Sequence, residues 1–466
     1  MRISKLEKLL EGALVRLSAL EKENAELRSR LGMNSSNSSK PPSSDPPGKK
    51  AEPKKPKSKR RRGGQPGHKG HKRSLLPVEE VDTLVPLRPN KCRGCGSSLI
   101  GHDSAPARHQ VFELPRVKPI VTEYQLHALP CACGQTTRAK LPSGVPRGAF
   151  GPSVMAVVAL LSGTYRISRR GIVQLCADLF GLEVSLGVVS KMEGKVSEML
   201  VVPVEEARDH VRDHLVVGMD ETGWREAKKK VWLWTVTTPL VTVFRIARSR
   251  GAKVAKEMLG EDFRGLLITD RWKAYTWLTR LCRQVCWAHL IRDFRGMKER
   301  GGRGSRIGGQ LLDRAHLMFR WWHRVRDGTM TQHAFKCRLA TLRAEVLELL
   351  RAGAICTGTK TAGMCREILK EGAALWNFAY VEGGEPTNNA SERAIRPAVL
   401  WRKGSFGTDS ERGSRFVERI LTVTTSLRQQ RRHVLSYLIE ACEADLRGED
   451  APSILPEVAI RDQIAA

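Results

Sequence analysis

Long apolar stretches are missing from this sequence. It has no run of 18 apolar residues, which argues against a membrane-spanning helix, and its charged N-terminal segment lacks the apolar centre of a secretory signal. Acidic residues are also scarce: 49 Asp and Glu stand against 79 Lys and Arg, which gives a formal net charge of +30. We therefore expect a cytoplasmic protein with no membrane partner and a surface that attracts polyanions. Nucleic acid is the favoured partner, and a ribosome-bound or membrane-surface protein is the alternative.

The eleven cysteines are an odd number, and four of them form two closely spaced pairs. This pattern does not suit a disulfide framework and indicates a reducing compartment with a metal site. A chain of 466 residues exceeds what one small hydrophobic core supports, so we expect roughly two to four domains.

Residues 1–31 carry a heptad pattern that predicts a leucine-zipper coiled coil and a parallel homodimer. The lone Asn24 at an a position is typical of a device that fixes register. Arg16 with Glu21, and Glu23 with Arg28, would attract across the dimer. The alternative is an amphipathic helix packed on its own protein. The a and d positions are Ile3, Leu6, Leu10, Ala13, Leu17, Leu20, Asn24, Leu27 and Leu31.

Residues 32–75 have the composition of a disordered basic arm, with too few apolar side chains to offset the entropy of ordering. Between Gly48 and Arg73, twelve Lys and Arg stand against one Glu, which predicts phosphate binding. The Gly-Gly-Gln-Pro-Gly stretch within it could enter a minor groove. A solubilising linker is the alternative. The candidate DNA contacts are Arg60, Arg61, Arg62 and Lys69.

Residues 76–145 hold the two cysteine pairs, each followed by a glycine that suits a tight turn. We expect Cys92, Cys95, Cys131 and Cys133 to bind one structural Zn²⁺ in a ribbon-like module. The intervening segments VFELP and IVTEYQLHAL look like strands. His109 and His127 lie nearby in sequence and are expected to be bystanders.

Residues 146–205 contain three apolar-periodic segments, for which Ser168 and Ser185 are expected N-caps. The arrangement resembles a helix-turn-helix with the third segment as recognition helix. A plain helical bundle is the alternative.

Residues 206–298 change to a β pattern. HLVVGMD predicts a strand ending in Asp220, and GLLITD predicts a fourth strand ending in Asp270. The order β-β-β-α-β-α-β is that of a ribonuclease-H-like sheet, in which the first and fourth strands are neighbours. Both Asp side chains would then reach the same place.

A third carboxylate, Glu392, lies in the segment EPTNNASERAIRP, where Thr387 or Asn388 is expected to begin a helix. Helical spacing puts Asn389, Glu392 and Arg396 on one face. Phosphodiester attack needs two divalent cations held by carboxylates, so Asp220, Asp270 and Glu392 are predicted to bind two Mg²⁺ or Mn²⁺ ions. Without the ions, mutual repulsion should leave the site poorly formed.

The segment between the second and third carboxylates is longer than a bare ribonuclease-H-like fold needs. Residues 299–383 are rich in helix formers and predict a helical insertion. Residues 384–447 would complete the core, and 448–466 would form a tail. The fold class expected is thus multidomain α/β.

The motifs NSSNSSKPPSSD, GGQPGHKGH, MDETGWRE, TDRWKAY, CWAHLIRDF and TNNASERAIRP, together with the cysteine pairs, resemble in order the transposases of the insertion-sequence 66 family. The resemblance implies a bacterial, nucleoid-associated DDE-type transposase with a zipper, a zinc module, a helix-turn-helix and a split catalytic core. It places the catalytic triad on Asp220, Asp270 and Glu392. It also matches His289 and Arg292 to a recurrent patch, for which we expect a supporting role near phosphate. Small accessory proteins of the same element are possible partners.

Two other functions compete with the transposase: a non-catalytic, zinc-containing DNA-binding regulator and a ribonuclease-H-like nuclease. A regulator has no need of the three acids. A nuclease would not need the zipper, the basic arm and the zinc module together.

Overall fold

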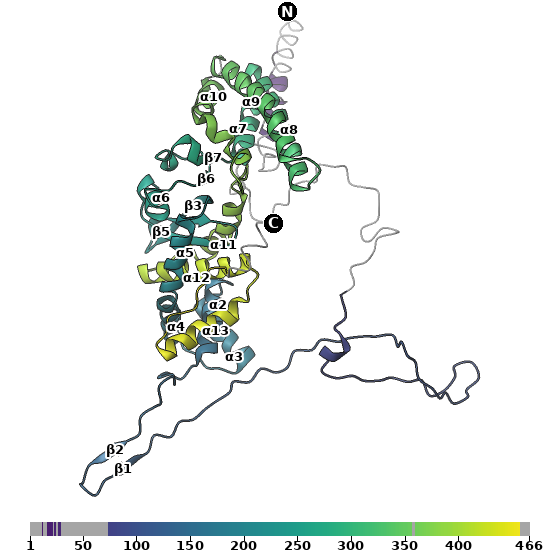
Figure 1. The fold of residues 1–466 in the computed structure, drawn as a ribbon, viewed down its shortest axis with the longest axis vertical. Coiled ribbons are helices and arrows are strands. Elements are labelled where there is room, and N and C mark those ends of the chain that lie inside the picture. Colours follow the sequence, from purple (N-terminus) through teal and green to yellow (C-terminus); the bar gives the residue numbers. More distant parts are fainter. Residues whose placement is uncertain are drawn as a thin grey trace, which may run out of the picture. The chain divides into compact units, whose positions relative to one another are not determined.

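The computed structural model describes residues 12, 16–21, 23, 24, 27, 28, 73–356 and 359–456 (Figure 1). The chain divides into two compact units, residues 1–49 with 119–466 and residues 50–118, and each is considered by itself. The described positions between 12 and 28 are helical. In the single chain Leu17, Leu20 and Leu27 are exposed on this segment. None of the helices in the described part combines the length and apolarity that a bilayer crossing requires.

A five-stranded mixed sheet lies at the centre of the larger unit, in the order β5-β4-β3-β6-β7. Its first three strands in sequence form an antiparallel meander, and the last two run parallel to β3. The expected adjacency of the first and fourth strands is confirmed by the parallel pairing of β3 with β6. The strands are β3 (Val216–Glu226), β4 (Lys229–Thr237), β5 (Thr242–Ala247), β6 (Leu266–Thr269) and β7 (Arg283–Val285).

The prediction that the first strand ends at Asp220 is wrong, because β3 continues to Glu226. Its continuation pairs with β4 up to Glu226 opposite Lys229, so a two-residue loop, Ala227-Lys228, closes the hairpin. Both loop residues have positive φ, 48° and 65°. Asn and Gly normally supply that conformation, so the sequence carried no turn signal here.

Alternation along β3 divides its side chains between the two faces of the sheet. Val217 and Met219 are buried with α6 (Ala252–Leu259), the helix that crosses over to β6. Trp224 points the other way, into a core shared with Ile395 of α11 (Asn389–Ser405). Asp220 lies four residues before Trp224 in the same strand, so its side chain points to the same face, toward α11.

Three helices precede the sheet as predicted, α2 (Pro152–Gly163), α3 (Arg169–Phe180) and α4 (Leu186–Met199). Ser168 and Ser185 accept N-cap hydrogen bonds from Gly171 and Val188, which confirms both expected caps. A fourth helix, α5 (Val201–Arg212), was not predicted. These helices pack with α12 (Glu411–Gln429) and α13 (Val434–Arg447) in the lower part of Figure 1.

Between β7 and α11 the chain is mainly helical, as expected for this stretch. Four helices share a separate apolar core (upper part of Figure 1). Trp322 is buried there against Phe335 and Phe378. The helices are α7 (Trp287–Glu299), α8 (Gly302–Arg326), α9 (Gln332–Ala354) and α10 (Thr359–Glu371).

Short 3-10 helices lie in connecting segments at several places along the described chain. They are η2 (Val78–Glu80), η3 (Lys273–Tyr275), η4 (Arg280–Cys282), η5 (Gly372–Leu375) and η6 (Asn377–Ala379).

The segment between the cysteine pairs differs from expectation. Within described residues 111–127 no strand forms, and every side chain there is exposed, because no neighbouring strand provides hydrogen-bond partners or a core. A small hairpin of β1 (Ala128–Pro130) and β2 (Thr136–Arg138) brackets the second cysteine pair.

Candidate active site

Asp220 lies where the pairing of β3 changes. Parallel pairing with β6 stops at Gly218, while antiparallel pairing with β4 continues, so the side chain projects beyond the end of β6. One carboxylate oxygen accepts a hydrogen bond from the Glu221 N–H at 2.9 Å. Burial, followed by the charge of Glu221 and those of Asp270 and Glu392, raises the pKa of Asp220 to about 8.

Asp270 follows β6 directly, as the sequence predicts. Its Oδ1 accepts a hydrogen bond from the Trp272 N–H at 2.8 Å, which fixes the turn after the strand. The half-buried side chain lines an open cavity of about 340 Å³. The other lining residues are Arg271, Trp272, His289, Arg292 and Asp293.

Glu392 stands in the first turn of α11. Asn388 is the N-cap residue, but its side chain makes no capping bond. Its Nδ2 instead donates to the Met219 carbonyl at 2.7 Å, and its backbone N–H donates to Cys286 Sγ at 3.2 Å. The start of α11 is thereby attached to both β3 and the beginning of α7.

Gly218 permits this close approach. A Cβ at this position would lie 2.6 Å from Asn388 Oδ1 and closer still to Ser391 Oγ. Any larger residue would push α11 away from β3, and Glu392 would move with it.

The three predicted carboxylates therefore come from β3, the end of β6 and the start of α11. Asp270 and Glu392 both act on the charge of Asp220, and Asp270 also raises the pKa of Glu392. Burial is the first cause of the raised pKa of Glu392, and the nearby Arg292 guanidinium opposes it. Segments distant in sequence thus contribute like charges to one region.

A network behind Asp220 was not foreseen. Glu221 is buried on the opposite face of β3, where its Oε1 accepts from Arg250 Nε at 2.8 Å and its Oε2 accepts from the Tyr275 hydroxyl. The Arg250 guanidinium lies over the rings of Trp232 and Trp272, 4.8 and 4.1 Å from their centroids. The indole N–H of Trp272 donates to the Arg250 carbonyl at 3.0 Å. These contacts tie the loop after Asp270 to the strand of Asp220.

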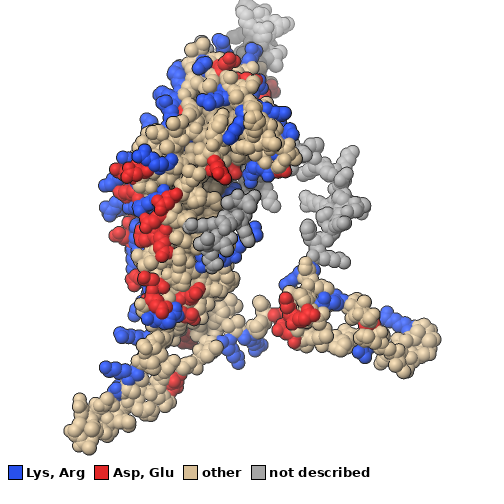
Figure 2. All heavy atoms as spheres, viewed as in Figure 1, with Lys and Arg blue, Asp and Glu red and all other residues tan. Residues whose placement is uncertain are grey.

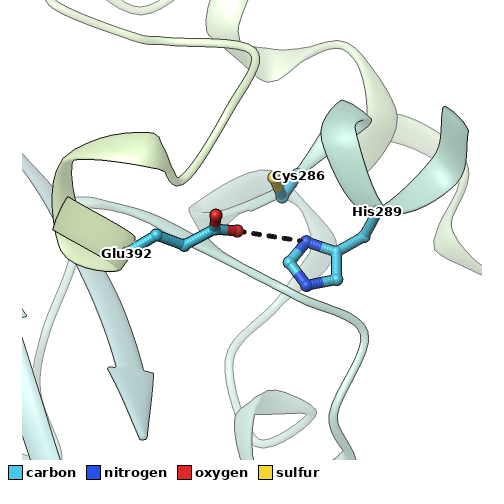
Figure 3. A group of neighbouring side chains, drawn as sticks. All are labelled: Cys286, His289 and Glu392. Atoms are coloured by element: carbon cyan, nitrogen blue, oxygen red, sulfur yellow. Dashed lines mark ion pairs between the residues drawn. The ribbon is translucent and has the colours of Figure 1, made fainter. Parts of the chain in front are cut away.

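His289 and Arg292 occupy the start of α7 beside the same cavity. His289 Nδ1 lies 3.8 Å from Glu392 Oε1 (Figure 3). Burial, then the charges of Arg292 and Arg271, lower the pKa of His289 to about 4, so the ring is neutral at pH 7. Arg271 also pairs with Asp293 at this cavity.

Asn389 and Arg396 are both exposed on α11. Asn389 lines a second, larger cavity of about 1420 Å³ together with Arg326, Arg393 and Arg428. Arg396 lines neither cavity.

Each cysteine pair sits in a tight turn. Gly96 donates its N–H to the Cys92 carbonyl and has a φ of 77°, and Gly134 donates to Cys131 with a φ of 87°. Hydrogen bonding between the Cys95 thiol and the Ser97 hydroxyl, 3.4 Å apart, is the first cause that lowers the pKa of Cys95 to about 7. The neighbouring thiol lowers the pKa of Cys95 in the first pair and that of Cys131 in the second. Cys92 and Cys95 belong to the smaller unit and the second pair to the larger, so one Zn²⁺ shared by all four stays a prediction.

Basic residues are spread over the larger unit. Figure 2 shows Lys and Arg along the left edge and the upper part of its visible face, with Asp and Glu among them, while the middle of that face carries few charged side chains. The arm residues Arg60, Arg61, Arg62 and Lys69 lie outside the described residues.

The central part of the chain matches a known protein family. Residues 147–415 match the family model described as "Transposase IS66 family". This span is more than half of the chain and contains all three carboxylates, so the protein is of the transposase class. More narrowly, the chain belongs to the IS66 family of transposases.

The chain is similar to one further family and to one further protein, and neither has a described activity. Residues 2–74 match a family of unknown function (DUF6444). The chain is also 25% identical over 421 residues to "Uncharacterized protein y4qI" of Sinorhizobium fredii (strain NBRC 101917 / NGR234), covering 83% of this chain and 76% of the relative.

Proposed function

We propose that this transposase is a catalytically active DDE enzyme, which hydrolyses a phosphodiester bond at each element end and then joins the freed 3′-OH to target DNA. The observation that carries the proposal is the convergence of Asp220, Asp270 and Glu392 from β3, β6 and α11. The strand order β5-β4-β3-β6-β7, with an antiparallel meander followed by parallel strands, supports a ribonuclease-H-like core.

The residues present suit hard divalent cations. The hydrogen bonds from Glu221 and Trp272 go to the Oδ1 atoms of Asp220 and Asp270, so the Oδ2 atoms are available. Glu392 Oε1 is buried without a hydrogen-bond partner. Mg²⁺ or Mn²⁺ would offset the repulsion among the acids, and two such ions would activate the attacking oxygen and stabilise the leaving oxygen.

The surrounding residues would hold this arrangement. Asn388 keeps the Glu392 helix on β3, and Glu221 with Arg250 keeps the Asp270 loop beside it. Arg271 and Arg292 place positive charge on the cavity that Asp270 lines, where a DNA phosphate could bind.

DNA binding outside the core is assigned to the basic arm, the cysteine-rich region 76–145 and helices α2–α4, with α4 as recognition helix. The exposed Leu17, Leu20 and Leu27 favour a dimer through residues 1–31. We propose in addition that the domains have the limits predicted from the sequence, and that small accessory proteins of the same element bind this transposase.

The test is strand transfer with Mg²⁺ by the full-length protein, using DNA from the inverted repeats expected to flank its gene. Asp270→Asn is compared with Asp262→Asn, an exposed Asp just before the same strand. We expect Asp270→Asn to lose joining and keep end binding, and Asp262→Asn to retain both. Equal joining by Asp270→Asn would rule out the proposed site.

The same assay separates the competing functions. A DNA-binding regulator would bind the ends, while even the wild type would neither cleave nor join them. A ribonuclease-H-like nuclease would cleave without strand transfer.

A further inference from the structure

Three side chains of different chemistry meet beside the proposed catalytic acids. Cys286 precedes α7, His289 stands in its first turn, and Glu392 reaches them from α11 (Figure 3). One ligand atom from each lies within 4.8 Å of the other two. Within the described residues no other group of three His, Cys, Asp or Glu side chains meets this criterion.

Ordinary hydrogen bonding does not account for this cluster. His289 Nδ1 and Glu392 Oε1 are both buried without a hydrogen-bond partner, although they face each other at 3.8 Å. Two buried polar atoms left without hydrogen-bond partners are costly unless something lies between them.

We propose that Cys286, His289 and Glu392 bind one borderline-soft divalent cation, of the Zn²⁺ or Co²⁺ type, and that this ion removes Glu392 from the catalytic cation pair. The second half of this statement rests on the proposed function. The first half stands on the cluster alone.

The ligand set decides the class of ion. Thiolate sulfur, imidazole nitrogen and carboxylate oxygen are the three kinds of protein ligand that Zn²⁺ takes, and three of them with a water in the fourth position make an open tetrahedral site. Mg²⁺ takes oxygen ligands and would not select a sulfur. On binding, Cys286 releases its proton to solvent as the sulfur–metal bond forms.

The surroundings prepare the site. Asn388 already donates its backbone N–H to Cys286 Sγ at 3.2 Å, but burial outweighs this bond and raises the pKa of the thiol to about 11, so the bound ion itself would have to displace the proton. The side chain of Glu392 is 39% exposed, and a change of its rotamer would close the remaining distance to the other two ligands. A carboxylate engaged in this way cannot complete the site with Asp220 and Asp270, and Zn²⁺ should therefore inhibit Mg²⁺-dependent strand transfer.

The direct test is a titration of the full-length protein with Co²⁺. Binding is monitored by the thiolate-to-cobalt charge-transfer absorption. Cys286→Ser is compared with Cys282→Ser, a nearby cysteine outside the cluster. The two cysteine turns can also bind Co²⁺, so the informative quantity is the difference between variants. We expect wild type and Cys282→Ser to bind one more Co²⁺ than Cys286→Ser, with affinity for it lowered about tenfold or more in His289→Ala.

Identical Co²⁺ titrations for wild type and Cys286→Ser would overturn the site. Circular dichroism of each variant establishes that it is folded, and His289→Ala tests the site without altering any cysteine. If Co²⁺ binds at Cys286 but Zn²⁺ inhibits wild type and Cys286→Ser equally, the competition for Glu392 is refuted. Absence of strand transfer by wild type with Mg²⁺ alone would refute the proposed function, and the Co²⁺ titration would still decide the site.

Discussion

The side-chain amide of Asn388 donates a hydrogen bond to the carbonyl of Met219 at 2.7 Å, across 169 positions of sequence. Met219 immediately precedes Asp220, and Asn388 begins the helix that carries Glu392. One buried contact therefore holds two of the three acids in register, although neither acid takes part in it.

Asn388→Leu removes this bond and leaves the Met219 carbonyl buried without its partner. We expect the free energy of unfolding to fall by about 1–3 kcal/mol. Strand transfer should fall more than end binding, because Glu392 loses its anchor. Urea unfolding and the transfer assay measure the two effects, with Asn389→Leu on the exposed neighbour as the stability control. Equal stability of the two variants would show that the bond contributes nothing.

Gly218→Ala tests the close approach of β3 and α11. The added methyl group would meet Asn388 Oδ1 and Ser391 Oγ, so we expect a loss of about 1–3 kcal/mol in stability. Ser391→Ala in the same chain should restore part of it. Gly309→Ala, where a Cβ on α8 meets nothing within 4 Å, should be neutral or stabilising. If both glycine variants unfold at the same urea concentration, the packing argument fails.

The loop Ala227-Lys228 holds both residues at positive φ, which costs an L-residue about 1 kcal/mol or more each. Replacing the pair by Asn-Gly should therefore raise the thermal midpoint and the free energy of unfolding by about 1–2 kcal/mol. Glycine at Lys229, which is already in β4, should instead lower stability. Destabilisation by Asn-Gly would contradict the assigned hairpin register.

Glu418 on α12 lies away from the active site and should make the free energy of unfolding depend on pH. It is fully buried and accepts a hydrogen bond from the Ile246 N–H. Burial raises its pKa from 4.5 to about 7, with Arg415 opposing the rise. Between these values the folded protein holds a proton that the unfolded chain has released. The free energy of unfolding therefore decreases as pH rises through this window, by at most about 3 kcal/mol, and levels off above it.

Glu418→Gln should remove this slope, so that the stability difference between wild type and variant changes from pH 4.5 to 7 and is constant beyond. Glu411→Gln, exposed at the start of the same helix, serves as the control and should follow wild type. If the free energy of unfolding of Glu418→Gln and that of wild type change with pH in parallel from pH 4.5 to 7, the raised pKa of Glu418 is refuted.

The positions of two of the three acids follow from local sequence patterns. Asp270 ends a run of buried apolar residues, and Glu392 opens a helix with a recognisable polar start, so both positions could be predicted. The extension of β3 beyond Asp220 could not, because its turn lacks Asn or Gly. The roles of Glu221 and Cys286 depend on contacts made by distant segments. The Cys-x-x-His spacing at the start of α7 was the one local signal for Cys286.

The central claim is that Asp220, Asp270 and Glu392 act as one unit. Its most direct test is the rate of Mg²⁺-dependent strand transfer by Asp220→Asn, Asp270→Asn, Glu392→Gln and their pairwise combinations, with end binding measured in parallel. We predict that each single variant lowers the rate by roughly a thousandfold or more, that the double variants are no slower, and that end binding persists. Single variants that transfer strands at the wild-type rate, or losses that multiply in the double variants, would contradict it.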